Sequence, residues 1–566
     1  MNKTYIYKRN PTVKRIFMAM LVPTILMNLT TAIGSVADTI IIGNYLDDSA
    51  LSVVTFATPI YMIINTFAAL FAVGGCIAMS IDSGKGERES SSRSFSQSIE
   101  LLAVTGILLL LSGLFFSPTI THWLGAEEDV FESVRQYAQI ILLGAPVFML
   151  NIGLAFFVRN DGRPKLSTIG MFTSIIVDII LNFVFVGYLN MGVAGAAYST
   201  VIGQLVSVVM VGTHFFSSKN TLRFKFTLDG TVWRVVHNGA SSALHFVYQF
   251  VTILIINHFM SNLAGTDGVV VYSVIFNLST VSLSVFEGIS QTIQPMISNY
   301  FGEKSYRNIK ETLSYAIVAV FLICGGVTLF LELFPKIVPI CFNIDDPLLI
   351  AKSVDAVRIF ATSMIVMTLN VVIGYYLQST ERNVMSMVII SLRCFALFLG
   401  ATFILGKLFR MNGVWAAYTV TEVLTLFIIV AMLCFKQRKM KKEGVCANIL
   451  LLDSTAEKST KCFTFDCEKD DFEDYVSHVS GSFEKNSEQG SALSKDAQAY
   501  LGVLKTCCVA KRGKYLQVEI NNTEKKVIIR DNLDHSAVAD DLQAAVSSDS
   551  KSDYGRVLGW NRICIE

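Results

Sequence analysis

One motif occurs twice, far apart in the chain. The segment NIGLAFFVRNDGRPKLS at Asn151–Ser167 returns as NVVIGYYLQSTERNVMS at Asn370–Ser386, with the first Asn, an aromatic pair, one Arg and the last Ser in common. Farther along, Ala196–Tyr198 returns as Ala416–Tyr418 at nearly the same spacing. A repeat of this length in an apolar chain predicts two similar membrane lobes that face each other, an arrangement typical of transporters.

Composition places most of the chain in a membrane. Of its 566 residues, 52% are hydrophobic and 16% are charged, and the mean hydropathy is +0.52. Because a helix needs roughly 20 apolar residues to cross a bilayer, we expect twelve spans, at 16–42, 51–79, 96–117, 136–158, 166–187, 194–216, 239–261, 269–298, 312–333, 357–379, 384–405 and 413–435. The expected fold is an all-α polytopic membrane protein followed by a small soluble α+β domain.

Basic residues are distributed unevenly between the expected loops. One side collects about 24 Lys and Arg and the other about 6, so by the positive-inside rule both termini of this multi-pass plasma (inner) membrane protein are cytoplasmic. Six helices in each copy then make the two repeats parallel. We divide the chain into an N-terminal six-helix lobe (1–217), a cytoplasmic linker (218–236), a C-terminal six-helix lobe (237–440) and a cytoplasmic soluble domain (441–566).

Several function classes are not indicated by the residues. No basic stripe lies outside the membrane flanks, so nucleic-acid binding is not expected. The 11 cysteines show no CxxC or Cys/His spacing, and the membrane part contains no Ser/His/Asp set, P-loop or metal-ligand spacing. We therefore expect a protein that is not an enzyme and has no cofactor. It would act as a monomer in contact with membrane lipid and small organic substrates.

Polar residues gather at one depth in the first lobe. Asp38 lies near the outer end of the first span, and Asp178 and Asn182 lie one helical turn apart near the outer end of the fifth. Thr200 lies in the sixth span, and Tyr137 opens the fourth. Charged groups within a membrane are costly and are functional candidates by default. Hard oxygen ligands suit Na⁺, and two close carboxylates also suit a proton. The alternative is structural hydrogen bonding across a helix interface.

Candidates in the second lobe are less clearly grouped. Those for a cleft or second-lobe polar site are Glu287, Gln291, Asn370 and Glu422. Glu287 would line a cavity or the interface between the lobes, whereas Glu422 lies in the middle of the twelfth span, where a packing role is favoured. Arg393 would neutralise a nearby acid. His245 is a candidate proton relay, although lone histidines are more often structural.

The chain resembles the multidrug and toxic compound extrusion (MATE) transporters over about residues 10–440. The resemblance rests on Pro23, Val36-Ala37-Asp38 and Gly43 in the first span, FFVRNDGRPKLS, MGVAGAAYST, GISQTIQPMISNYFGE and YYLQSTER. It implies twelve helices in two lobes around a V-shaped cleft. It also implies export of bulky, often cationic or amphipathic compounds in exchange for inward Na⁺ or H⁺.

The resemblance also implies where a coupling cation binds. The family's first-lobe cation site matches this chain at Asp38, Tyr137, Asp178, Asn182 and Thr200. Many members read Asn-x-x-x-Asp in the fifth helix, whereas this chain reads Asp-x-x-x-Asn, so the charge lies one turn farther inward. Some members use acids in helices seven and ten, where this chain has Tyr248-Gln249 and Thr368-Leu369-Asn370. We therefore expect the coupling cation to bind in the first lobe, and Na⁺ is the only metal ion expected there.

The tail after residue 440 has the pattern of a small soluble domain. Tyr515–Ile520 and Lys526–Arg530 are expected to be strands around a turn at Asn521–Glu524, and LGWNRICIE closes the chain as a further strand or helix edge. The tail faintly resembles the ATP-binding domain of histidine kinases. Its matches at that domain's key positions are poor, with Gly502, Thr506, Asp531 and Leu533 there. A degenerate domain that binds no ATP is favoured, and it is a candidate for binding a cytosolic regulator.

Two rival functions remain open at this point. One is a lipid-linked oligosaccharide flippase of the same superfamily, which would show extra helices and a cleft rich in Arg and Lys. The other is a membrane sensor that signals through the C-terminal domain. The leading hypothesis is a secondary-active efflux antiporter.

Overall fold

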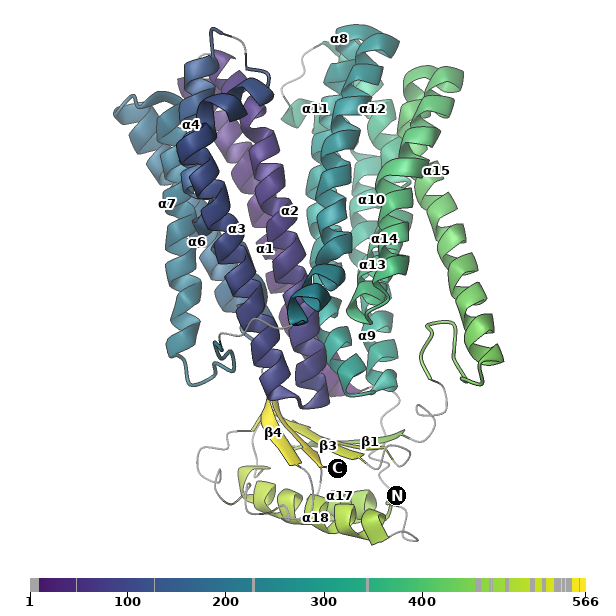
Figure 1. Ribbon diagram of the computed structural model, residues 1–566. Helices are drawn as coiled ribbons and strands as arrows, with labels where there is room; N and C mark the ends of the chain where they lie inside the picture. Colours follow the sequence, from purple (N-terminus) through teal and green to yellow (C-terminus); the bar gives the residue numbers. More distant parts are fainter. Residues whose placement is uncertain are drawn as a thin grey trace.

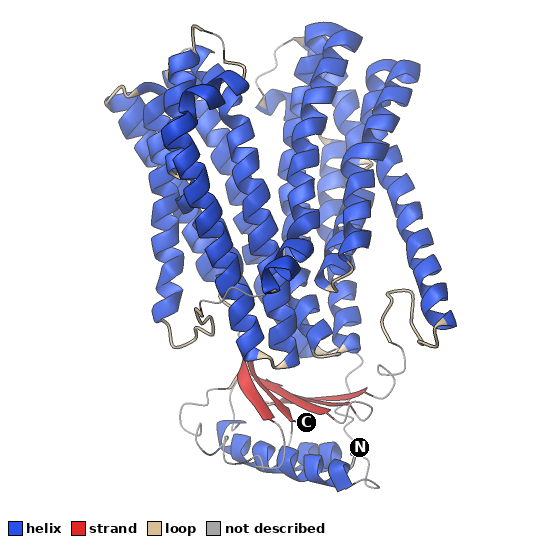
Figure 2. Ribbon diagram, viewed as in Figure 1, coloured by secondary structure: helices blue, strands red, loops and turns tan. Residues whose placement is uncertain are grey.

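The computed structural model describes residues 10–46, 48–126, 128–225, 230–342, 346–453, 460–467, 470, 472–483, 488–508, 515–521, 526–533, 541, 545, 552–558 and 560–565. Most of these residues are helical, and a small sheet with two helices lies against one end of the helix bundle (Figure 1, Figure 2).

The first lobe is formed by the helices before residue 217. They are α1 (Pro11–Tyr45), α2 (Asp48–Lys85), α3 (Arg88–Trp123), α4 (Phe131–Leu143), α5 (Ala145–Asn160), α6 (Pro164–Asn182), the π-helical turn η1 (Phe183–Tyr188), α7 (Gly192–Gly212) and the 3₁₀ turn η2 (Thr213–Phe216). The apolar residues of α2, α4, α5 and α7 form the core of this lobe.

The second lobe is formed by the helices from residue 231 to residue 442. They are α8 (Thr231–Gly302), α9 (Tyr306–Ala319), η3 (Val320–Cys324), α10 (Gly325–Leu333), α11 (Ile337–Cys341), α12 (Pro347–Ala361), α13 (Met364–Ser379), α14 (Asn383–Ser391), η4 (Leu392–Ala396) and α15 (Leu397–Lys442). The largest apolar cluster among the described residues is centred in this lobe and also includes the first half of α1.

The helices agree with the expected spans. Among the described residues, nine helices are long and apolar enough to cross a membrane, and two bent helix pairs pass the same test together. The helical stretch Asn383–Lys442 contains two of the twelve expected spans. Each of the other ten expected spans corresponds to one helix or to one bent pair. A left-handed residue inside α15, Arg410 (φ 52°), separates those two spans. The expected all-α membrane fold is thus confirmed.

Two spans are bent, for different reasons. α4 and α5 meet at 46° beside Gly144 and Pro146, where a kink is expected. α12 and α13 meet at 44° around Thr362 and Ser363, without a Pro or Gly at the bend. Both hydroxyls there donate to backbone carbonyls three residues back, 2.7 Å away in each case. Such bonds compete with the helical pattern, and this second bend was not predicted.

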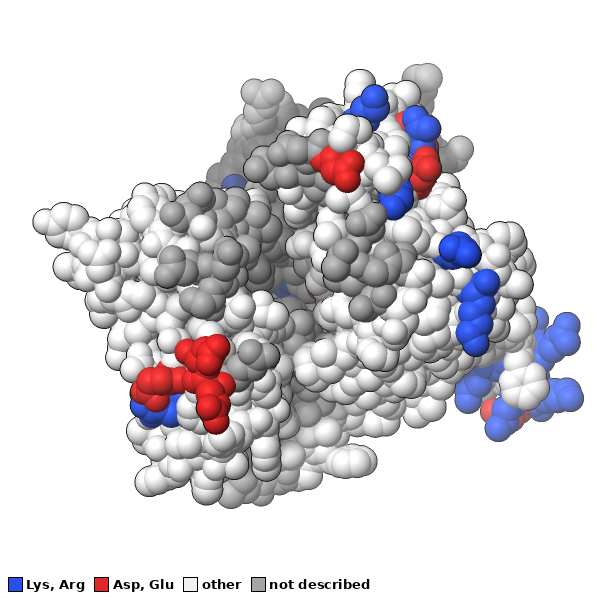
Figure 3. All heavy atoms as spheres, turned by 90° about the horizontal axis from the view of Figure 1, so that it is seen from above, with Lys and Arg blue, Asp and Glu red and all other residues white. Residues whose placement is uncertain are grey.

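The two lobes contact each other closely at the end that bears the C-terminal domain. A Cβ added to Gly239 of α8 would lie 1.8 Å from Leu70 O of α2, and one added to Gly302 would lie 2.1 Å from Ile81 O. Only glycine permits this approach between α2 and α8. At the opposite end the lobes diverge, and a view onto that end shows a hollow between them (Figure 3). The molecule is therefore closed at one face and open at the other.

The C-terminal domain is a sheet with helices on one face. Among the described residues, β1 (Thr460–Asp466), β2 (Tyr515–Asn521), β3 (Lys526–Asp531), β5 (Trp560–Ile565) and β4 (Ser552–Val557) pair antiparallel in that order. α17 (Phe472–Ser480) and α18 (Glu488–Cys508) cover the face away from the bundle (Figure 1). β2, β3 and β5 agree with the expected strands, whereas most of the turn expected at Asn521–Glu524 lies outside the described residues.

Candidate cation-binding site

Two helices of the first lobe bring two carboxylates and an amide together. Asp38 comes from α1, and Asp178 and Asn182 lie one turn apart on α6. Asn182 Nδ2 donates to Asp38 Oδ1 over 3.0 Å and to Asp178 Oδ1 over 3.2 Å. Asp178 is 6% exposed and Asn182 is fully buried. A single amide thus holds two acids from different helices at one point.

The charge of these two acids is not neutralised. Among the described residues, neither Asp38 nor Asp178 makes an ion pair with a basic side chain. The Oδ1 atom of Asn182 is buried without a hydrogen-bond partner. A buried acceptor without a donor is costly, and uncompensated charge at membrane depth is more so. A cation bound among these oxygens would relieve both costs.

Two further helices contribute hydroxyl groups to this region. Thr200 of α7 donates to a backbone carbonyl one turn back over 3.0 Å and lies close to the Asp178 carboxylate. The hydroxyl of Tyr137 on α4 lies 3.1 Å from that of Tyr61 on α2, and both phenols are near enough to the two acids to interact with them electrostatically. The structure therefore brings all five expected residues into one region.

Tyr61 is the member of this region that sequence reasoning missed. The available signal was a phenol in an otherwise apolar span, but its pairing with Tyr137 joins helices that are distant in sequence. The whole set offers carboxylate, amide and hydroxyl oxygens. Such donors suit a hard cation such as Na⁺, and the two neighbouring carboxylates suit a shared proton.

The acid in the twelfth span of the second lobe is paired. Arg393 Nε donates to Glu422 Oε1 over 2.7 Å, and Asn370 Nδ2 donates to Glu422 Oε2 and to its backbone oxygen, both over 2.8 Å. The expectation that Arg393 neutralises a nearby acid is confirmed. Glu422 and Arg393 line a cavity whose other walls combine aromatic and aliphatic residues, among them Tyr272, Phe276, Phe398 and Tyr418, with polar residues such as His245 and Gln249.

Glu287 and Gln291 take part in separate contacts. Glu287 Oε1 lies 3.6 Å from His245 Nε2, within the second lobe. Gln291 Oε1 accepts from Arg159 Nη1 over 2.8 Å and from Asn28 Nδ2 over 3.3 Å, so it contacts the first lobe. Glu287 is also near enough to Arg393 to interact with it electrostatically, so it belongs with the Glu422 pair, whereas Gln291 lies at the junction between the lobes. Arg159, which counts as a loop charge by sequence, is completely buried at this junction.

A protein-family model described as MatE matches the chain twice, over residues 23–184 and 241–403. One match lies in each lobe, so the same model recognises both copies of the internal repeat. Together the two matches span more than half of the chain.

Relatives and solved structures agree with this match. Multidrug export protein MepA of Staphylococcus haemolyticus is 26% identical over 437 residues, which cover 74% of this chain and 94% of the relative. The protein of that name from Staphylococcus saprophyticus is 22% identical over 418 residues, covering 73% and 91%. A solved outward-facing conformation of a multidrug resistance MATE family transporter of the MOP superfamily is 19% identical, with a TM-score of 0.70 over 74% of this chain and 94% of that chain. That likeness shows the fold, and it leaves about a quarter of this chain without a counterpart.

Proposed function

This chain belongs to the MatE family, and on that basis we propose that it is an antiporter that exports bulky cationic or amphipathic organic compounds in exchange for inward Na⁺ or H⁺. The observation that carries the coupling proposal is the uncompensated pair Asp38 and Asp178, held by Asn182, in the first lobe. The names of the MepA relatives support the export of several drugs.

Coupling follows from the charge of this cluster. A cation that binds among Asp38, Asp178 and Asn182 neutralises the repulsion between the acids and gives Asn182 Oδ1 a partner. Because α1 and α6 each supply a ligand, the bound cation favours the conformation of the first lobe in which those helices approach each other. A ligand shifts a conformational equilibrium only by its differential affinity for the two states. Antiport therefore requires the cation and the exported compound to favour opposite states.

The proposed orientation places the C-terminal domain in the cytoplasm. Turns at the face that bears this domain carry Lys85, Arg163 and Lys304, whereas the opposite face carries Glu128 and Asp129. The positive-inside rule supports this orientation. The hollow between the lobes then opens to the outside, where an exported compound would leave (Figure 3).

Vesicles containing the full-length protein test the proposal. A Na⁺ gradient and a pH gradient are imposed separately, and the flux of a fluorescent organic cation is followed. We expect one of the two gradients to drive flux against the gradient of the dye. Flux that responds to neither gradient would contradict the antiport proposal.

A further inference from the structure

One face of the C-terminal sheet is polar and yet buried. Thr464, Gln517, Arg530 and Arg562 occupy one row across four adjacent strands, by the register of the pairs Thr464↔Gln517, Gln517↔Arg530 and Arg530↔Arg562. None of these four residues is more than 4% exposed. A polar sheet face would ordinarily lie in water. Here the ends of the membrane helices cover it (Figure 1).

The two arginines of this row share an acid from outside the domain. Arg530 and Arg562 lie directly opposite each other on β3 and β5, and like charges in that position destabilise a sheet. Glu303, immediately after α8, pairs with both: it contacts Arg530, and its Oε1 lies 2.9 Å from Arg562 Nε. Its side chain is fully buried. Docking on the second lobe therefore places one buried carboxylate between the two arginines.

The charge of Arg530 is maintained in this buried position. Burial alone would lower its pKa, but the carboxylates of Glu303 and Glu519 outweigh burial and raise the pKa above its ordinary value. The guanidinium therefore remains a cation, and removing its partners would leave a buried charge uncompensated.

Arg562 also contacts the first lobe. Its Nη1 donates to Ser83 O over 3.1 Å, and its Nη2 donates to Gly84 O over 2.8 Å. These carbonyls belong to the last turn of α2, where a cation is favoured by otherwise unsatisfied carbonyls and by the helix dipole. One guanidinium thus joins the end of α2 in the first lobe to Glu303 of the second lobe.

This junction lies where the backbones of the two lobes approach closely. A Cβ added to Gly84 would lie 2.1 Å from Asn299 O, so the backbones of α2 and α8 touch beside the arginine. Opening the molecule at this face would separate Gly84 from Glu303. Arg562 could then keep only one of its two sets of partners.

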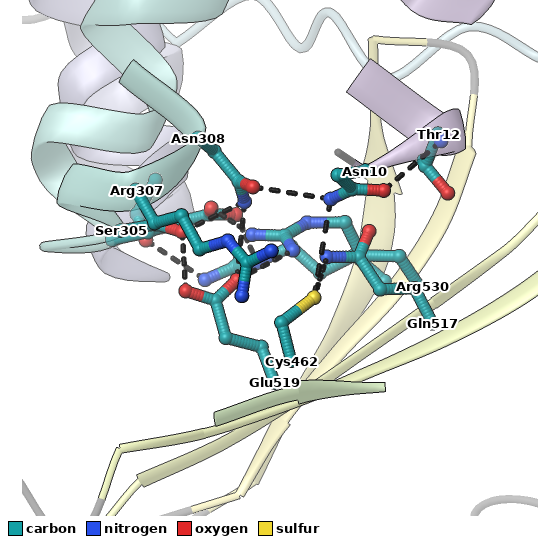
Figure 4. Close-up of polar contacts among 12 residues, drawn as sticks. Asn10, Thr12, Ser305, Arg307, Asn308, Cys462, Gln517, Glu519 and Arg530 are labelled. Carbon is teal, nitrogen blue, oxygen red and sulfur yellow. Dashed lines mark hydrogen bonds and ion pairs between the residues drawn. The ribbon is translucent and has the colours of Figure 1, made fainter. Parts of the chain in front are cut away.

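Further contacts fix the domain to the bundle. Ser305 Oγ and Asn308 Nδ2 both donate to the Glu519 carboxylate, the latter over 3.1 Å. Asn10, which caps the start of α1, donates to Cys462 Sγ of β1 over 4.0 Å. Figure 4 shows Glu519 and Arg530 rising from the sheet toward Ser305 and Asn308. The docked position is therefore defined by buried, directional bonds.

We propose that the C-terminal domain is an inhibitory clamp that holds the two lobes together at this face, with Arg562 as the residue that bridges α2 and Glu303. While the domain is docked, the face that bears it stays closed, and the lobes can open there only after Arg562 leaves one of its partners. The inhibition of transport rests on the proposed antiport, but the effect of the clamp on the lobes does not.

The test measures the separation of the lobes in the full-length protein. Spin labels are placed at Glu87→Cys and Lys304→Cys, two exposed positions on either side of the junction, after the exposed Cys341 and Cys446 are replaced by Ser. We expect one short distance in the parent protein. In Arg562→Ala, the ratio of long to short distances should rise roughly tenfold or more, because hydrogen bonds from a charged donor are lost.

Matched variants make the result decisive. Arg562→Lys keeps a positive charge beside Glu303 but lacks the guanidinium group that donates to both carbonyls. It should therefore give an intermediate shift in the distances, and it can be measured if Arg562→Ala fails to fold. Lys505→Ala removes an exposed ion pair within the domain and should leave the distances unchanged. Unchanged distances in Arg562→Lys and in any folded Arg562→Ala would overturn the clamp. Faster dye flux in the Arg562 variants than in the parent protein would support the inhibition of transport. If the distances shift but neither the parent nor the variants transport the dye, the antiport proposal is refuted and the clamp is not.

Discussion

The two lobes share a scaffold down to individual hydrogen bonds. Ser167 Oγ donates to Ala155 O over 2.9 Å in the first lobe, and Ser386 Oγ donates to Gly374 O over 3.0 Å in the second. Each bond joins the helix at the start of the repeated motif to the helix at its end. The copies therefore retain the bonds that set the angle between these two helices.

The lobes differ in how their buried acids are compensated. In the first lobe, Asp38 and Asp178 share one amide and have no basic partner among the described residues. In the second lobe, Glu422 is paired with Arg393 at 2.7 Å. A neutralised pair is structurally complete, whereas two uncompensated acids require a cation from solution. The common scaffold therefore supports the fold, and we propose that the missing counter-charge marks the coupling site.

The strongest test of this difference is Asp38→Asn. The substitution preserves size and hydrogen bonding but removes one of the two charges that would hold the cation. We expect gradient-driven export in vesicles to fall by at least about tenfold, since a loss of 1.4 kcal/mol in cation affinity already has that effect.

Glu422→Gln is the matched control, because it also removes one buried carboxylate charge but does so in the other lobe. Glutamine Oε1 can still accept from Arg393, and Asn370 keeps its bond to the backbone oxygen of residue 422. It should retain export that depends on the gradient. The comparison between the lobes would be reversed if Glu422→Gln abolished coupling and Asp38→Asn did not.

The second test concerns stability. Arg393→Met removes the only basic partner at 4 Å or less from Glu422 among the described residues, and it should lower the free energy of unfolding by about 3–5 kcal/mol, because it leaves a buried charge unpaired. Asp178→Asn should instead stabilise the protein in cation-free buffer, because it removes a buried charge that has no basic partner among the described residues. Thermal unfolding in detergent measures both variants. Equal destabilisation by the two would show that Asp178 is already compensated.

Much of this fold could be predicted because it depends on local patterns. The repeat and the apolar runs predicted two lobes and their spans, since hydrophobic runs and distances to helix ends can be read along one helix at a time. The distances to the helix ends also predict that Asp38, Asp178 and Asn182 lie at one depth in the membrane. The Asp-x-x-x-Asn spacing also placed the last two on one face of α6.

The remaining features depend on contacts between distant parts of the chain. Alternation in β2 predicts a strand with one face in water, but Gln517 and Glu519 are buried by docking. Arg562 and Glu303 are far apart in sequence, and neither is distinguished from an ordinary surface charge by its neighbours. Arg159 lies at the end of a helix, where the sequence alone does not distinguish a residue at the lobe interface from an ordinary loop charge. Such residues are identified only once the lobes and the domain are assembled.

The smallest expected effect concerns the turn before the repeated Arg, where the two copies of the motif have different residues in the same left-handed conformation. The left-handed position before the repeated Arg is Gly162 (φ 79°) in the first lobe and Glu381 (φ 55°) in the second. Gly162→Ala should destabilise the protein by about 1 kcal/mol, because a Cβ is strained in this conformation. Glu381→Gly relieves that strain but loses the contact of 2.7 Å with Arg234 Nε, so we expect a net change within about 0.5 kcal/mol. Thermal unfolding of the two variants side by side measures the difference. A larger loss in Glu381→Gly than in Gly162→Ala would mean that the ion pair with Arg234, and not backbone strain, dominates the second turn.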